Sequence, residues 1–125
     1  MLKVQVLNNI SSLGLDKFSS DIYDVTVKDN NPDAILVRSA KMHELETGEN
    51  LKAIGRAGAG VNNIPLEKMS GKGVVVFNTP GANANAVKEL VISSMLLASR
   101  NICQAWNYVK NLPLENLKAT VEDGK

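Results

Sequence analysis

Five short apolar runs, separated by turns and short helical stretches, constrain the fold of this chain most strongly. We expect strands at residues 4–7, 23–27, 34–37, 51–55 and 74–77, the second of them nearer an edge because it is more polar. Helices are expected over residues 15–20, 43–47 and 65–71. Strands alternating with helices are typical of a parallel sheet covered on both faces. The pattern therefore predicts an α/β fold, a flavodoxin-like doubly wound parallel sheet of about five strands.

From residue 84 the pattern changes to a single long helix that reaches about residue 111. Apolar residues recur along it at spacings of three and four, and its middle is apolar on the other side as well. We expect it to be buried on all sides, against its own sheet and against another domain or subunit. Residues 112–125 are polar and contain no further predicted strand.

The composition excludes several functional classes. The net charge is +1 and the charged residues are interspersed, which indicates neither a nucleic-acid surface nor a membrane-surface patch. The single cysteine, Cys103, rules out an internal disulfide framework and a multi-cysteine metal site, and we expect no bound metal. The amino terminus is too short and polar for a signal peptide, and no apolar run is long enough to span a bilayer. We therefore expect a cytoplasmic protein.

A glycine-rich stretch from Gly55 to Asn63 follows a predicted strand and precedes a predicted helix. Gly58 and Gly60 begin a G-x-G-x-x-G pattern, but Asn63 stands where the third glycine is needed. No carboxylate occurs roughly 20 residues further on, where the residue that binds the ribose belongs. We expect that this loop does not bind a dinucleotide as that motif does.

The same loop is suited to an anion. Its glycines leave successive backbone N–H groups accessible, and Arg56 lies among them. Arg38, followed by Ser39, ends a neighbouring predicted strand. Since parallel strands present their carboxyl ends to one crevice, both guanidinium groups predict a site for a carboxylate or phosphate. The alternative is that the glycines only shape a turn and both arginines are solvated.

Four motifs together resemble the D-isomer-specific 2-hydroxyacid dehydrogenase family. Residues 37–39 match its V-R-S strand end, and residues 54–63 match its G-R-A-G-x-G-V-D-N loop. Residues 72–80 resemble its K-G-I-x-V-x-N-T-P segment. Residues 83–89, from Asn83 to Glu89, resemble its N-x-x-x-A-x-E helix start, but Lys88 stands where a small residue is common. The resemblance covers nearly all of the chain and is strongest to the branch that acts on 3-phosphoglycerate. Asn62 replaces an Asp of the pattern, and we expect it to cap the following helix.

The resemblance implies NAD-dependent oxidation of a small D-2-hydroxy acid. Its first candidate is the conversion of 3-phospho-D-glycerate to 3-phosphohydroxypyruvate, the first step of serine biosynthesis. Substrate binding is assigned to Arg38, Ser39, Arg56, Ala57, Gly58, Ala59, Gly60 and Asn83. Cofactor contacts are assigned to Ala59, Thr79 and Asn83. Residues 1–80 would form a substrate-binding domain, and residues 81–125 an interdomain helix and the start of a truncated Rossmann domain.

The resemblance also places the catalytic histidine and most of the NAD site beyond residue 125. This chain alone is then expected to be inactive, with His43 on a surface helix away from the crevice. A homodimer is expected through the helix at residues 84–111. A stand-alone flavodoxin-like module that binds a small anion or a partner protein is the rival interpretation. Glyoxylate, hydroxypyruvate and D-lactate remain alternative substrates, and NADP remains an alternative cofactor.

Overall fold

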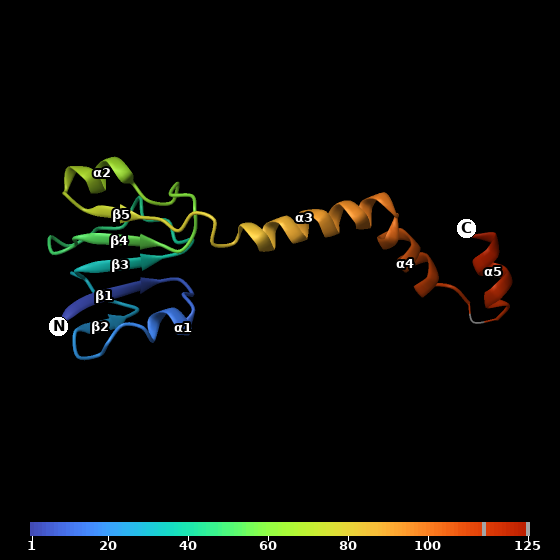
Figure 1. Ribbon diagram of the computed structural model, residues 1–125, viewed down its shortest axis with the longest axis horizontal. Coiled ribbons are helices and arrows are strands. Elements are labelled where there is room, and N and C mark those ends of the chain that lie inside the picture. Colours follow the sequence, from blue (N-terminus) through green and yellow to red (C-terminus); the bar gives the residue numbers. More distant parts are fainter. Residues whose placement is uncertain (114, 125) are drawn as a thin grey trace. The chain divides into compact units, whose positions relative to one another are not determined.

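The computed structural model describes residues 1–113 and 115–124, and it confirms the predicted parallel sheet (Figure 1). The strands are β1 (Leu2–Leu7), β2 (Tyr23–Thr26), β3 (Ala34–Val37), β4 (Ala53–Arg56) and β5 (Val75–Phe77). Their order is β2-β1-β3-β4-β5, and every neighbouring pair is parallel. This is the flavodoxin-like order, and β2 lies at an edge as predicted.

The chain forms two compact units, Met1–Asn83 and Ala84–Lys125. The first contains the sheet together with α1 (Ser12–Leu15) and α2 (Leu66–Gly71). The second contains α3 (Ala84–Ser99), α4 (Ile102–Lys110) and α5 (Leu117–Asp123). The assignment of residues 1–80 to substrate binding and of residues 81–125 to nucleotide binding stays a prediction, because compactness does not reveal what a unit binds.

A buried cluster in the first unit joins the central strands to α2 and to the loop after β3. Its five largest fully buried side chains are each at most 1% exposed: Ile35, Val37, Met42, Ile54 and Met69. The β-branched members suit strands, and the flexible methionines fill the irregular space between strands and helix. Replacing one of the larger members with alanine costs about 2–5 kcal/mol. This cluster is what holds the carboxyl ends of β3 and β4 in place.

Two of the predicted helices are wrong. The helix predicted over residues 15–20 is the single turn α1, which ends at Leu15 and is followed by turns. Residues 43–47 form no helix, and the amide of Leu45 donates to the Met42 carbonyl at 3.2 Å in an isolated turn. Met42 and Leu45 both pack on the core. Their spacing of three residues therefore serves a turn as well as it would serve a helix.

Gly48 lies close to the loop that contains Asn31. A Cβ atom at this position would lie 2.9 Å from the backbone Cα of Asn31 and would also clash with the Asn31 side chain. Glycine is therefore required by the close approach of two loops. In contrast, the helix predicted from Pro65 is confirmed as α2, which is followed by Gly73 in the left-handed region, at φ 73°. Pro65 occupies its cap position and no side chain caps it, so the cap expected from Asn62 is wrong.

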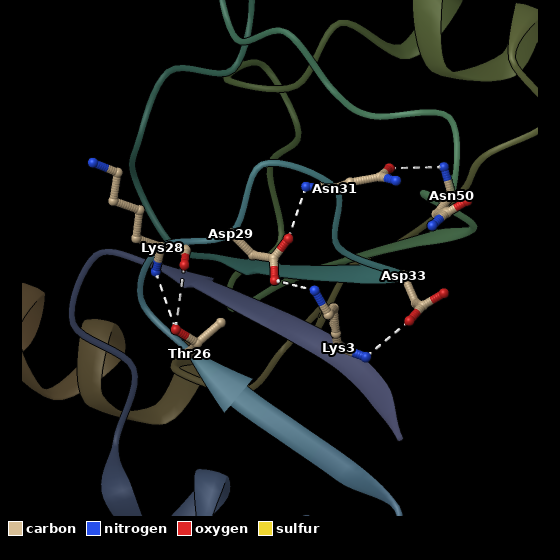
Figure 2. Close-up of polar contacts among 7 residues, drawn as sticks. All are labelled: Lys3, Thr26, Lys28, Asp29, Asn31, Asp33 and Asn50. Atoms are coloured by element: carbon tan, nitrogen blue, oxygen red, sulfur yellow. Dashed lines mark hydrogen bonds and ion pairs between the residues drawn. The ribbon is translucent and has the colours of Figure 1, made fainter.

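A polar network joins the start of β1 to the loop that precedes β3 (Figure 2). The Lys3 amide donates to Asp33 Oδ2 at 2.8 Å, and the Lys3 ammonium lies 3.1 Å from Asp29 Oδ2. Asp29 Oδ1 also accepts the Asn31 amide at 2.8 Å. The Asn50 amide donates to Asn31 Oδ1 at 3.1 Å, which extends the network to the segment before β4. Three segments distant in sequence are thus tied together at the amino-terminal edge of the sheet.

The single helix predicted over residues 84–111 is wrong, because the structure has α3 and α4 with a break between them. The Ser99 hydroxyl donates to the Leu96 carbonyl at 3.1 Å, and Asn101 adopts the left-handed conformation at φ 51°. Asparagine tolerates that conformation better than most residues. Helix α5 lies in the polar segment for which the sequence predicts no further strand.

Within the second unit, α3 and α4 bury none of their residues. Leu90, Met95 and Trp106 are 69%, 66% and 70% exposed. The predicted burial of this segment is therefore not achieved inside its own unit. None of the helices in residues 1–113 and 115–124 combines the length and hydropathy that a bilayer crossing requires.

Candidate anion site at the carboxyl edge of the sheet

Strands β3 and β4 lie next to each other and end together (Figure 1). Val37 pairs with Arg56 in the strand register, and the Ala57 amide donates to the Val37 carbonyl at 2.8 Å. Arg38 follows Val37 directly, so both predicted arginines leave the sheet from adjacent strand ends. The Arg38 side chain is exposed and has no hydrogen bond or ion pair with the described residues.

The Arg56 side chain lies against the glycine loop. A Cβ atom at Gly58 would lie 2.7 Å from Arg56 Cζ and would clash with Nη1, while the Gly58 backbone has φ 152°. The guanidinium therefore occupies space that only a glycine leaves open. Arg56 Nε is buried and has no acceptor among the described residues. Because a buried donor without an acceptor costs about 1–3 kcal/mol, an anion that reaches this group would gain binding energy.

The segment after β5 holds the glycine loop. Thr79 Oγ1 accepts the Gly58 amide at 2.7 Å and donates to the Arg56 carbonyl at 3.3 Å. The Thr79 amide donates to the Gly58 carbonyl at 3.0 Å, and Asn78 Nδ2 donates to the Ala59 carbonyl at 2.8 Å. The Thr79 hydroxyl is thus engaged inside the chain. Its role in cofactor binding stays a prediction.

Two of the four loop amides predicted to bind substrate already have acceptors. Ala57 donates to Val37, and Gly58 donates to Thr79 and, at 2.9 Å, to the Arg56 carbonyl. The amides of Ala59 and Gly60 have no acceptor among the described residues, and both residues are exposed. The geometry leaves these two amides free for an anion.

Asn8 holds the turn that carries Arg38 and Ser39. Its Oδ1 accepts the Ser39 amide at 3.1 Å and also the Ala40 amide, and its backbone is left-handed at φ 68°. The sequence alone predicts no role for Asn8 at the site. The signal is weak, because its partners lie more than 30 residues away and no local pattern identifies them.

Asn63 holds the same turn from the other side. It is buried, and its Nδ2 donates to the Ala40 carbonyl at 2.9 Å and to the Arg38 carbonyl at 3.5 Å. Asn63 stands where the dinucleotide motif needs its third glycine, and its side-chain amide stabilises the turn after β3. Its Oδ1 is buried without a partner among the described residues.

A cavity of about 180 Å³ opens beside the glycine loop. It is lined by Ile10, Leu36, Gly55, Arg56, Ala57, Phe77, Asn78 and Thr79. These residues come from the carboxyl ends of the adjacent strands β3, β4 and β5 and from the segments that follow β1, β4 and β5, which is the usual ligand position in such sheets. Among its lining residues only Arg56 is charged, and Arg38, Ala59 and Gly60 do not line it.

His43, which is predicted to lie away from the crevice, and Asn83, which is predicted to lie at the site, are both outside this arrangement. His43 lies on a turn rather than on a helix and lines a separate groove with residues at the start of α2. Asn83 is exposed and makes no hydrogen bond with the glycine loop in the described part of the chain. Residues 1–113 and 115–124 contain no cluster of histidine, cysteine or carboxylate side chains suited to a metal ion.

Residues 4–122 match the family described as D-isomer specific 2-hydroxyacid dehydrogenase, catalytic domain. The chain belongs to this family. The predicted resemblance is thereby confirmed, and the family consists of oxidoreductases.

The chain is also similar to individual oxidoreductases. The chain is 46% identical over 76 residues to a hydroxypyruvate reductase of Thermotoga maritima, covering 58% of this chain and 25% of that protein. It is 34% identical over 131 aligned positions to a D-3-phosphoglycerate dehydrogenase of Archaeoglobus fulgidus, covering 94% of this chain and 25% of that protein. This member of the family thus spans about a quarter of the length of these two curated relatives.

A solved structure shares the fold. The crystal structure of NAD⁺-bound 3-phosphoglycerate dehydrogenase of Entamoeba histolytica matches with a TM-score of 0.67 and 30% identity. The match covers 77% of this chain and 38% of that one. The five-stranded parallel sheet therefore belongs to a dehydrogenase fold.

Proposed function

We propose that this chain is the substrate-binding part of an NAD-dependent dehydrogenase that oxidises 3-phospho-D-glycerate to 3-phosphohydroxypyruvate. The observation that carries the proposal is the buried Nε of Arg56, which has no partner among residues 1–113 and 115–124, in the loop that also exposes the amides of Ala59 and Gly60. A guanidinium and free amides suit a carboxylate. Arg38, at the end of the adjacent strand, supplies a second guanidinium for the phosphate.

The residues of this chain fit only one end of a dinucleotide. Ala59 and Asn83 are exposed and free to meet a nicotinamide, whereas the Thr79 hydroxyl is engaged with the loop. NAD would supply the hydride acceptor when bound. The chain itself would hold and orient the acid, which lowers the barrier by proximity. We propose no catalysis by these 125 residues alone, because their single histidine, His43, lines a different groove.

Hydroxypyruvate is the second candidate substrate, because the relative in Thermotoga maritima bears the name hydroxypyruvate reductase. The two candidate reactions differ in the phosphate group. Arg38 is exposed and has no partner in the described part of the chain, so it is the group that would distinguish them.

The complete protein should be assayed with NAD and 3-phosphoglycerate, D-glycerate or D-lactate. The reverse reaction should be assayed with hydroxypyruvate and its 3-phosphate. We expect kcat/KM to be at least about 10-fold higher for the phosphorylated acids, the value of one charge-assisted hydrogen bond. A higher value for hydroxypyruvate would favour the second candidate. Absence of turnover with every acid would contradict both.

A further inference from the structure

Four hydrogen bonds join the segment after β5 to the glycine loop, and three of them involve Thr79. The Thr79 hydroxyl lies between a donor and an acceptor of the loop, the Gly58 amide at 2.7 Å and the Arg56 carbonyl at 3.3 Å. The Thr79 backbone amide also donates to the Gly58 carbonyl, at 3.0 Å. Both polar groups of the Gly58 backbone are therefore held by one residue.

Gly58 needs this support because of its own conformation. Its φ of 152° lies in a region that residues with a side chain rarely adopt, and the Arg56 guanidinium fills the space beside it. The free amides of Ala59 and Gly60 follow directly in the chain. If the backbone of Gly58 changed its conformation, the orientation of those two amides would change. The space that the Arg56 guanidinium occupies would change with it.

We propose that Thr79 is a positioning residue for the anion site, acting through Gly58 and Arg56 rather than by touching substrate or cofactor. This inference rests on the proposed function, because it assumes that the loop binds the acid. The hydroxyl holds Gly58 in place, and Gly58 in turn fixes the two free amides and leaves room for the guanidinium. A residue that only binds cofactor would leave its hydroxyl free, whereas here both its donor and acceptor capacity are used.

Thr79→Val and Thr79→Ser form a matched pair for the test. Valine keeps the shape and removes the hydroxyl, whereas serine keeps the hydroxyl and removes the methyl group. In the complete protein we expect Thr79→Val to raise the KM for 3-phosphoglycerate about 10-fold, the loss of roughly two neutral hydrogen bonds. The KM for NAD and the kcat should change less. Thr79→Ser should stay close to the parent in all three constants.

A second measurement does not depend on activity. In the 125-residue chain, hydrogen exchange of the Gly58 amide should accelerate about 10-fold or more in Thr79→Val and remain slow in Thr79→Ser. If Thr79→Val disturbs folding, Thr79→Ala removes the same hydroxyl from a smaller side chain and should accelerate that exchange in the same way. Inactivity of the complete protein towards all 2-hydroxy acids would contradict the proposed function. The exchange measurement would still decide whether the Thr79 hydroxyl holds the Gly58 amide.

Three outcomes would overturn the proposal. One is unchanged exchange of the Gly58 amide in Thr79→Val. Another is an increase in the KM for NAD that exceeds the increase for the acid, which would make Thr79 a cofactor ligand. The third is a folded Thr79→Ser variant as impaired as Thr79→Val, because the methyl group rather than the hydroxyl would then matter.

Discussion

Val37 of β3 and Arg56 of β4 are register partners, and the amide that follows Arg56 donates to the Val37 carbonyl at 2.8 Å. This pairing brings the segment that carries Arg38 next to the glycine loop. The sheet therefore determines the separation of the two arginines at their Cα atoms, before any side-chain contact is formed. Since Val37 is fully buried in the core cluster, the same packing that stabilises the fold also places the site.

Replacing Arg56 should weaken substrate binding more than replacing Arg38. We expect Arg56→Ala to raise the KM of the complete protein for 3-phosphoglycerate about 10-fold or more, because a charge-assisted hydrogen bond of roughly 1.5–3 kcal/mol is lost. Arg56→Lys should recover little, since lysine cannot supply the buried Nε. Arg38→Ala should raise the KM for phosphorylated acids and leave that for D-glycerate nearly unchanged. Lys52→Ala, which removes an exposed cation before β4, is the control. Unchanged kinetics in both arginine variants would remove them from the site.

Gly58 and Gly60 should respond very differently to alanine. Gly58→Ala should destabilise the fold by about 1–3 kcal/mol, because the new methyl group meets the Arg56 guanidinium and the backbone lies at φ 152°. Gly60→Ala should change stability by only about 0.5 kcal/mol, because its Cβ would lie 3.5 Å from Asn62 Oδ1, an ordinary contact. Urea unfolding of both variants measures the difference. Equal destabilisation would show that the loop does not hold this conformation in solution.

The part of the fold that could be predicted from sequence is the part built from continuous apolar runs. The run at residues 34–37 coincides with β3, a central strand that is buried on one face and half-buried on the other and therefore contains no polar interruption. The loop after β3 could not be predicted, because Met42 and Leu45 have helical spacing although each packs on the core from a turn. The break at Asn101 was missed because asparagine permits a left-handed residue without requiring one.

The candidate site shows the same limit. The positions of Arg38 and Arg56 at strand ends follow from the sheet, and any parallel pairing of these strands would predict them. The roles of Asn8, Asn63 and Thr79 depend on hydrogen bonds between residues more than 20 positions apart. Such bonds depend on the conformations of the loops, so they cannot be predicted from the spacing of residues along the chain.

Acid should remove the stability that the Asp29 carboxylate gains from the Asn31 amide and the Lys3 ammonium (Figure 2). The Asn31 amide, and then the Lys3 ammonium, stabilise the Asp29 carboxylate and lower its pKa below the usual 3.8. A lowered pKa stabilises the fold fully above the unfolded value, and this contribution is lost as the pH falls through the folded value. Between pH 7 and about pH 3 the parent should therefore lose more stability than Asp29→Asn, measured by urea unfolding. Asp16→Asn, at a carboxylate without a hydrogen bond or ion pair in the described residues, is the control. Identical pH dependence of all three proteins would contradict this role.

The 125-residue chain should bind NAD only weakly. The amides of Ala57 and Gly58 already donate within the chain, and the buried Asn63 side chain fills the place of the third glycine. Only the amides of Ala59 and Gly60 remain free, and two amides are fewer than a fingerprint loop offers to a pyrophosphate. Isothermal titration calorimetry should give a dissociation constant above about 1 mM, equivalent to less than roughly 4 kcal/mol of binding. Micromolar affinity would show that the loop acts as a dinucleotide fingerprint after all.

The second unit should drive self-association. Met95 and Val91 lie four residues apart on α3 and are 66% and 51% exposed, so they form part of an apolar face without partners in their own unit. Burying one large apolar side chain contributes about 1.5–3 kcal/mol, so pairing of two such faces between copies is favoured. In sedimentation experiments we expect the 125-residue chain to form dimers or larger species. Met95→Glu should weaken this association at least about 10-fold, because a charge would have to be buried. Ser93→Glu adds the same charge elsewhere on the same helix, and it should leave association nearly intact. A monomer at every concentration would contradict the homodimer, and Trp106 fluorescence typical of a buried indole would show that α4 is covered within one chain.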